Sequence, residues 1–351
     1  MKILFFFVHP AKYYLFKHTI NTLQKEGVYV DVAIISKEVL EELVKVENWN
    51  VINIFPCGRK YKYFPIIVNT IYFFFLTLIK LFKLSFKEKY DVFITDDCLT
   101  LIGKVRRIPS IFFIDNEPDT IPGINLLINS ATKVLVPNAI RPKIAKKNIV
   151  SFEGYKELAY LHPKYFSPNK EIVRKYLNID KPFVIIRMVS FHASHDINKK
   201  GISNKVLKQL IDELTPYVAI YLSAERKISD DFDSLRLKID PLDIHHLLYY
   251  ANFIISDSGT MTSEAAILGT PAIFYSDFVG KLTVIDEKEY KYNLIYLIKS
   301  GEVEKLMSCI NGLLAKKELK KEWIIKRNKM LKQTDDLNEI ILKSIYDIKY
   351  C

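Results

Sequence analysis

The sequence predicts an α/β protein with two domains, each built around a parallel β-sheet. Apolar runs that are typical of strands alternate with helical patterns along its 351 residues. These runs are apolar throughout, as expected for parallel strands that are covered on both faces. The length exceeds that of one typical hydrophobic core, and Pro163 and Pro168 interrupt the pattern within residues 161–169. We therefore expect a linker there and a domain boundary after residue 165.

The first domain is expected over residues 1–165. Its opening run, residues 2–8, is too short for a signal peptide and indicates a buried strand. Strands and helices then follow in order: a helix over 13–26 that ends at Gly27, strands over 28–35, 51–55 and 91–95, a helix over 98–105, and strands over 110–114 and 133–136.

The second domain is expected over residues 166–335. Its pattern predicts a strand over 183–189, a helix over 205–214, a strand over 217–222, a helix over 243–250, and strands over 253–256 and 271–275. Helices are expected to fill the rest of the chain. The last of them, over 336–351, is expected to pack back on the first domain.

The net charge of +11 fits a nucleic acid, an anionic lipid or a polyphosphate as a partner. Many of the lysines lie in residues 316–332, where Leu319 and Trp323 at helical spacing indicate a solvated amphipathic helix. No nucleic-acid signature is present, so we expect no nucleic-acid partner. The four cysteines form no CxxC pair, which predicts no zinc site and a location in the reducing cytoplasm.

Residues 64–86 form the most hydrophobic segment of the chain. Only 15 residues run from Pro65 to Ile79 before Lys80 follows, whereas a membrane-spanning helix needs about 20 apolar residues. Two interpretations stay open: a helix buried in the first domain, or a helix lying on an anionic membrane. The second draws support from the basic residues Arg59, Lys60 and Lys62 just before the segment, and from Lys80 and Lys83 on one face within it.

The most informative motif begins at Asp257, where a strand ends in Asp-Ser-Gly-Thr and a short helix opens. The N–H groups at a helix start lack intrahelical partners and attract anions, so Ser258, Gly259 and Thr260 predict a phosphate site. The hydroxyl of Thr262 is expected to add a donor, and Glu264 is expected to accept bonds from a ribose. The alternative is an ordinary helix cap at Ser258.

These residues resemble the GT-B superfamily, which includes nucleotide-sugar glycosyltransferases and UDP-N-acetylglucosamine 2-epimerases. The resemblance is carried by Asp257–Glu264 and by Leu268-Gly269-Thr270-Pro271. The sequence is most similar to an uncharacterised branch of that superfamily. That branch's pattern is seen here in His9-Pro10 with Phe16-Lys17, Gly154-Tyr155-Lys156-Glu157 near His162-Pro163, and residues 187–196.

The resemblance implies two Rossmann-like domains facing each other across a cleft, with a nucleoside diphosphate sugar bound mainly to the second. The sugar nucleotide, expected to be UDP-linked, is a substrate, and the resemblance implies neither a cofactor nor a metal ion. It implies that the phosphates contact Ser258, Gly259 and Thr260, and that Glu264 binds the ribose. Further binding residues are expected at Arg187, Ser190, His192, Lys200 and Asp257.

A transferase needs a base for the acceptor hydroxyl and positive charge for the departing diphosphate. Candidate bases lie at expected strand ends of the first domain: His9, Asp96, Asp97 and Glu117. His192, Lys200 and the helix start at Gly259 are candidates for stabilising the leaving group. As alternatives, His9 is a strand-end histidine satisfied by backbone, and Asp97 is the N-cap of the next helix.

We therefore expect a metal-independent glycosyltransferase of surface glycan assembly, with a glycan or lipid-linked acceptor, at the inner face of the membrane. The first alternative is a 2-epimerase, hydrolysing or non-hydrolysing, although its Gly-Thr-Arg-Pro loop is replaced here by His9–Lys12 and its His-Arg-Arg-Glu-Asn stretch by residues 191–196. The second alternative is a non-catalytic module that binds a nucleotide or glycan. The pair His245-His246 is interpreted as surface or packing, and the oligomeric state is left open.

Overall fold

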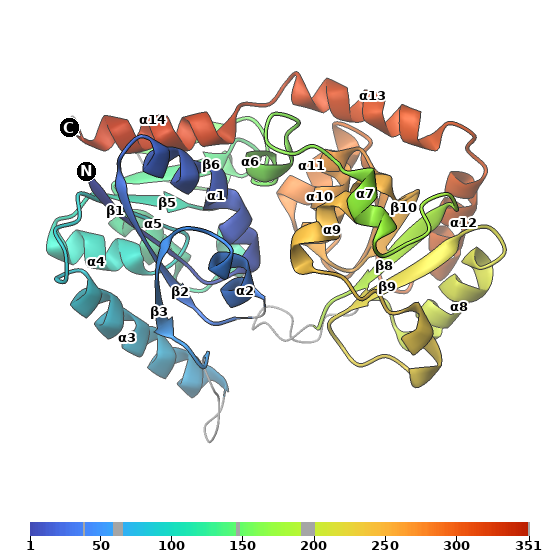
Figure 1. The fold of residues 1–351 in the computed structure, drawn as a ribbon, viewed down its shortest axis with the longest axis horizontal. Helices are drawn as coiled ribbons and strands as arrows, with labels where there is room; N and C mark the ends of the chain where they lie inside the picture. Colours follow the sequence, from blue (N-terminus) through green and yellow to red (C-terminus); the bar gives the residue numbers. More distant parts are fainter. Residues whose placement is uncertain (38, 59–65, 145–147, 191–200, 350–351) are drawn as a thin grey trace. The chain divides into compact units, whose positions relative to one another are not determined.

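The computed structural model describes residues 1–37, 39–58, 66–144, 148–190 and 201–349 (Figure 1). The chain divides into two compact units. Unit 1 comprises Met1–Tyr160 and Asp335–Cys351, and unit 2 comprises Leu161–Thr334. The division falls after Tyr160, whereas the sequence predicted a boundary after residue 165. The C-terminal segment belongs to unit 1.

Unit 1 is built on a seven-stranded sheet whose neighbouring strands all pair in parallel. The strand order is β3-β2-β1-β4-β5-β6-β7. The central strands are buried along their whole length, as their apolar sequences predict. The strands are β1 Lys2–Phe7, β2 Tyr29–Ile35, β3 Asn50–Phe55, β4 Val92–Thr95, β5 Ser110–Phe113, β6 Lys133–Pro137 and β7 Ile149–Phe152.

Helices cover both faces of this sheet (Figure 1). One face carries α1 Pro10–Lys25, α2 Leu40–Lys45 and α14 Leu337–Lys349, and α14 contacts α1 and β7. The other face carries α3 Ile66–Leu84, α4 Leu99–Arg106 and α5 Ile124–Ser130. The short α6 Leu158–Leu161 lies where the chain leaves unit 1 for unit 2. Across the described residues, no helix is long and apolar enough to cross a membrane.

Unit 2 contains a smaller parallel sheet of five strands in the order β12-β11-β10-β8-β9. Helices α8 and α12 contact each other and lie on one face, and α9 and α10 lie on the other. The strands are β8 Phe183–Met188, β9 Ala219–Ala224, β10 Phe253–Ser256, β11 Ala272–Tyr275 and β12 Ile295–Ile298. The helices are α7 Lys170–Arg174, α8 Asn204–Leu214, α9 Ile244–Tyr250, α10 Gly259–Leu268, α11 Thr283–Tyr290, α12 Val303–Leu314 and α13 Leu319–Leu331.

The predicted α/β class and the two parallel sheets are confirmed, and several details differ. Helix α1 begins at Pro10 rather than at residue 13, because proline suits the first helical turn and His9 caps it. Helices were expected to fill the chain after residue 275, and this is wrong because β12 pairs with β11. Strand β7 and the short helices α2, α5, α6 and α7 were not predicted.

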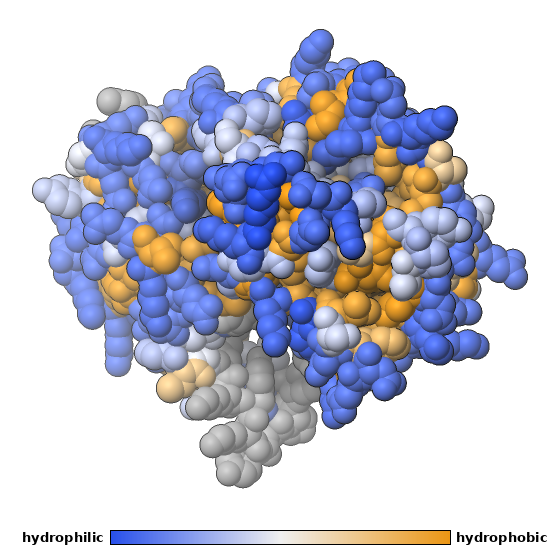
Figure 2. Space-filling model, turned by 45° about the vertical axis from the view of Figure 1, so that its right-hand side comes forward, coloured by the Kyte–Doolittle hydropathy of each residue, from blue (hydrophilic) through white to orange (hydrophobic). Residues whose placement is uncertain are grey.

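The surface is mainly hydrophilic on the face drawn in Figure 2, with hydrophobic residues exposed in patches between the charged ones. Apolar atoms are a normal part of a protein surface, so isolated exposed residues of this kind carry no functional meaning. A contiguous row of exposed hydrophobic residues differs from isolated ones because it can form an interaction surface, and helix α3 carries such a row.

Candidate functional site

Each sheet has one point at which the chain reverses its direction of strand addition. In unit 1 this point lies between β1 and β4, and in unit 2 it lies between β8 and β10. Ligands of open parallel sheets bind beyond the carboxyl ends of the strands at such points. His9 and Asp96 follow β1 and β4, and Asp257 follows β10. The predicted residues therefore lie where the topology favours a ligand in each unit.

The start of α10 presents backbone N–H groups beyond the end of β10. Ser258 is the N-cap, and its Oγ accepts a 3.4 Å hydrogen bond from the N–H of Met261. In the described part of the chain, the N–H groups of Gly259 and Thr260 donate no hydrogen bond, and both residues are half-buried. Both the cap and the phosphate site that were offered as alternatives are thus compatible, since the cap leaves these two donors available.

Thr262 does not add a donor, contrary to expectation. Its side chain is buried, and its hydroxyl donates a 2.7 Å hydrogen bond to the carbonyl of Ser258 within the helix. Gly259 also has a packing role, because a Cβ there would lie 2.7 Å from Cδ1 of Ile285 on α11. The small residue lets α11 pack close to the start of α10.

Glu264 lies further along α10 and is buried. Its Oε1 lies 3.1 Å from Nε2 of His245 on the neighbouring helix α9. His246 instead stacks on Phe166 and accepts a hydrogen bond from the N–H of Asn169. The interpretation of the histidine pair as surface or packing holds for both residues, since His245 is buried against Phe166, and His245 also contacts a predicted site residue.

Asp257 anchors the backbone of two separate segments. Its Oδ1 accepts a 2.7 Å bond from the N–H of Val189, and its Oδ2 accepts a 3.2 Å bond from the N–H of Ile202. Arg226 donates to Oδ2 at 3.0 Å. A Cβ on Gly201 would lie 2.4 Å from Oδ2, so the chain passes directly over this carboxylate. Asp257 therefore acts in the structure as a positioning residue for the loops that follow β8.

Arg187 projects from β8 toward the neighbouring strand β9. Its Nη1 donates a 2.9 Å hydrogen bond to Oγ of Ser223, and its guanidinium pairs with the carboxylate of Glu225. The N–H of Ser190 donates to the same carboxylate at 3.3 Å. Two other expected binding residues, His192 and Lys200, lie outside the described residues.

The site of unit 1 centres on a buried carboxylate held between two lysines. Oδ1 of Asp115 accepts a 2.8 Å hydrogen bond from Nζ of Lys12, and Oδ2 lies 2.6 Å from Nζ of Lys156. Burial acts to raise the pKa of Asp115, but the two ammonium groups outweigh it and hold the pKa well below the usual range. Asp115 is therefore an anion within a cationic surrounding.

Asp96 shares this site but has the opposite protonation behaviour. Burial, together with the nearby carboxylates of Asp97 and Asp115, raises the pKa of Asp96 to about 6, although Lys12 opposes the shift. Lys12 Nζ lies 3.8 Å from Oδ2. The other oxygen, Oδ1, is buried and has no hydrogen-bond partner among the described groups. Such a carboxyl is poised to exchange a proton near neutral pH.

His9 caps α1 through its side chain. Its Nδ1 accepts a 3.1 Å hydrogen bond from the N–H of Ala11, as the structural alternative anticipated. Burial and the charges of Lys37, Lys156 and Lys12 lower the pKa of His9 to about 3, so the imidazole is neutral.

Asp97 and Glu117 are held by other groups. The N-cap of α4 is Cys98, so the alternative of Asp97 as the N-cap is wrong by one residue. Oδ1 of Asp97 accepts a 2.6 Å hydrogen bond from the N–H of Cys98. Glu117 is buried, and its Oε2 lies 2.5 Å from Nζ of Lys143. The structure thus joins Asp96 to the central charge cluster of unit 1, while Glu117 has its own cation.

Sequence reasoning missed the residues that hold the carboxylates, and each had a signal. Lys12 follows the first strand within the His9-Pro10 motif, and Lys156 lies in the Gly154–Glu157 motif. Glu225 and Arg226 come directly after β9. Basic residues beyond the carboxyl ends of parallel strands are a signal of the same kind as the acids.

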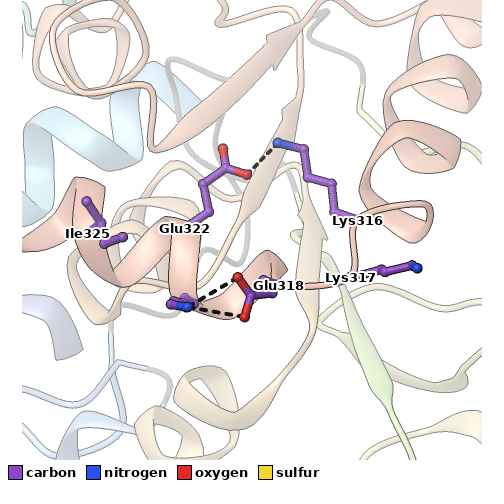
Figure 3. Close-up of a pocket in the computed structure, with 6 residues that line it drawn as sticks. Lys316, Lys317, Glu318, Glu322 and Ile325 are labelled. Carbon is purple, nitrogen blue, oxygen red and sulfur yellow. Dashed lines mark hydrogen bonds and ion pairs between the residues drawn. The ribbon is translucent and has the colours of Figure 1, made fainter.

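A surface hollow lies elsewhere in unit 2, at the start of α13 (Figure 3). Its charges pair with one another: Lys316 lies 2.6 Å from Glu322, and Lys321 lies 3.2 Å from Glu318. None of the predicted site residues lines it. The residues that the structure describes contain no group of three His, Cys, Asp or Glu side chains that could hold a metal ion.

Comparison with solved structures gives the same fold over nearly the whole chain. The UDP co-structure of MnaA from S. aureus has a TM-score of 0.70 at 16% identity and covers 98% of this chain and 95% of its own. UDP-GlcNAc 2-epimerase from Neisseria meningitidis, bound to UDP-GlcNAc, has a TM-score of 0.66 at 15% identity, with 99% and 100% covered. MurG from Acinetobacter baumannii has a TM-score of 0.62 at 14% identity, with 99% of each chain covered. These similarities show the GT-B fold that the sequence predicted.

The sequence itself is similar to one further protein and matches one protein family. The uncharacterized protein MJ0665 of Methanocaldococcus jannaschii is 26% identical over 221 residues, which are 60% of this chain, and the chain spans 62% of that relative's length. The family described as "Protein of unknown function (DUF354)" matches residues 6–349. The chain thus belongs to the DUF354 family.

Proposed function

We propose that this protein is a glycosyltransferase that uses a nucleoside diphosphate sugar, expected to be UDP-linked, and transfers the sugar to a glycan or lipid-linked acceptor. The observation that carries the proposal is the buried Oδ1 of Asp96, which has no partner among the described residues, on a carboxyl whose pKa is raised to about 6. A base with a pKa near the working pH is suited to take the proton of an acceptor hydroxyl.

The donor is proposed to bind at the start of α10. The N–H groups of Gly259 and Thr260 and the helix dipole would stabilise the diphosphate, so no metal ion is required in this mechanism. Arg187 and Glu264 are proposed to contact the donor as well. Asp257 would act indirectly, by fixing the loop backbone at Val189 and Ile202.

A second candidate, a sugar-nucleotide 2-epimerase, is favoured by one specific observation. Three buried or half-buried carboxyl groups, Asp96, Asp115 and Glu117, follow the two neighbouring strands β4 and β5. Removal of the proton at C2 of the sugar and elimination of the nucleotide need several acid–base groups. The two lysines lower the pKa of Asp115 and make it a poorer base than Asp96, and Glu117 is paired with Lys143.

One experiment separates the two reactions. The protein is incubated with UDP-N-acetylglucosamine and other UDP-sugars in D₂O, with and without lipid-linked and free glycan acceptors. UDP release that requires an acceptor, with no deuterium at C2, is the expected result. Deuterium at C2 or a new epimer without an acceptor would establish the epimerase instead. Binding of UDP-sugars without either outcome across the panel would leave a non-catalytic binding module.

A further inference from the structure

Helix α3 has apolar side chains on two opposite faces. The inner face packs into unit 1, where Thr77, Leu81 and Leu84 are buried. The outer face carries a row of large apolar side chains that are each 39–58% exposed. We call this row the outer stripe; it comprises Val68, Ile71, Tyr72, Phe75, Ile79, Phe82 and Phe86.

The outer stripe is a continuous surface rather than scattered residues. At 3.6 residues per turn, its six helical members fall within about 100° of arc, along most of the length of α3. It continues past the helix end, because the rings of Phe82 and Phe86 are 5.0 Å apart. The stripe holds seven of the fourteen large hydrophobic residues that are exposed in the described chain. A concentration of this kind marks an interaction surface.

The charges beside the outer stripe are positive. Helix α3 contains no acidic residue, and Lys83 and Lys87 are exposed near its C-terminal end. The guanidinium of Arg106 on α4 lies 3.5 Å from the ring centre of Phe86. The nearby Glu88 has its own cation, since its carboxylate lies 3.4 Å from Nζ of Lys2. The expected partner is therefore apolar in the middle and anionic at the edge.

We propose that the outer stripe docks unit 1 on the surface of an anionic lipid bilayer. A helix with this pattern lies in the interface, with its aromatic and aliphatic side chains among the acyl chains and its cations at the headgroups. A second copy of this chain is a poorer partner, because each copy carries a net charge of +11 and both faces would bring cations together. The inference goes beyond the proposed reaction and does not depend on it.

The test is flotation of the full chain with phosphatidylcholine vesicles, with and without phosphatidylglycerol, at low and high salt. The wild type is expected to float with the anionic vesicles and to bind less at high salt. The double variant Phe75→Ser/Ile79→Ser removes apolar area and is expected to weaken the partition coefficient about tenfold or more. The double variant Lys83→Glu/Lys87→Glu is expected to lose about as much on anionic vesicles only.

The matched control is Ile325→Ser, which removes a side chain that is 64% exposed on α13 and is expected to change nothing. Circular dichroism and sedimentation of each variant show whether it is folded and whether it associates. Absence of flotation with anionic vesicles, or equal flotation of Phe75→Ser/Ile79→Ser and the wild type, would overturn the proposal. A dimer that Phe75→Ser/Ile79→Ser dissociates, without vesicle binding by the wild type, would assign the stripe to a second copy.

Discussion

Lys12 donates a 2.8 Å hydrogen bond to Asp115, and both side chains are buried although 103 residues separate them in the chain. Lys156 contacts the second oxygen of the same carboxylate at 2.6 Å. The carboxylate thus links α1 to the segments after β5 and β7. Without this carboxylate, Lys12 would keep Asp96 at 3.8 Å and Lys156 would keep Glu157 at 4.0 Å, and such poorly paired buried cations are costly.

The first prediction is that Asp115→Asn lowers the free energy of unfolding by about 3 kcal/mol, because two poorly solvated ammonium groups lose their closest counter-charge. Urea unfolding at neutral pH measures the change. Asp119→Asn is the control, since Asp119 is exposed in the same loop and its change should lie within about 0.5 kcal/mol of zero. Equal stability of the two variants would mean that the cluster adds nothing to the fold.

The strands of the central sheets could be predicted because their signal is local. Phe5 and Ile94 belong to short apolar runs with nothing polar inside, and parallel strands need no other pattern. Strand β12 was missed for a related reason. The run Ile295–Ile298 is as short and apolar as a buried helix segment, and only its pairing with β11 decides between the two.

The position of the candidate site could be predicted from the sequence, but the roles of its individual carboxyl groups could not. The sequence indicated that Asp96 and Asp257 follow strands, and topology brings both to the reversal points of their sheets. It could not show that both carboxylate oxygens of Asp257 accept hydrogen bonds from Val189, Ile202 and Arg226, because these donors are 31 to 68 residues away in the sequence. Which carboxyl is a base and which is an anchor depends on such distant partners.

The second prediction concerns the pH dependence of stability. The pKa of Asp96 is about 6 in the folded protein, against about 3.9 in an unfolded chain, so the folded state holds the proton more tightly. Its ionisation therefore costs stability, by up to about 3 kcal/mol, as the pH rises from about 4 through 6. Asp96→Asn should remove this cost and gain stability relative to the wild type above pH 6.

The comparison is made by urea unfolding of both proteins at several pH values, since other groups titrate equally in each. The difference between them should be smallest near pH 4 and constant well above pH 6. A difference that does not change with pH would show that Asp96 titrates normally in the folded protein.

The third prediction is that Glu264→Ala weakens UDP binding by about 1–3 kcal/mol, because a charged hydrogen-bond partner of the ribose is lost. Calorimetric titration with UDP gives the affinity. Glu304→Ala serves as the control, because Glu304 is exposed on α12. An unchanged affinity would remove Glu264 from the proposed site and leave it as a structural partner of His245.

The last prediction tests the positioning role of Asp257 through the glycine that passes over it. In Gly201→Ala the new Cβ would lie 2.4 Å from Oδ2 and 2.6 Å from Cβ of Asp257, so one of the two segments must move. The carboxylate has little freedom, since three donors hold it. We expect a loss of about 1–3 kcal/mol in the free energy of unfolding and weaker UDP binding. The matched control is Gly312→Ala in α12, where no atom lies within 4 Å of the new Cβ, and alanine should raise stability by about 1 kcal/mol. If both substitutions stabilise the protein alike, the close approach at Asp257 does not constrain the loop, and the indirect role assigned to Asp257 is wrong.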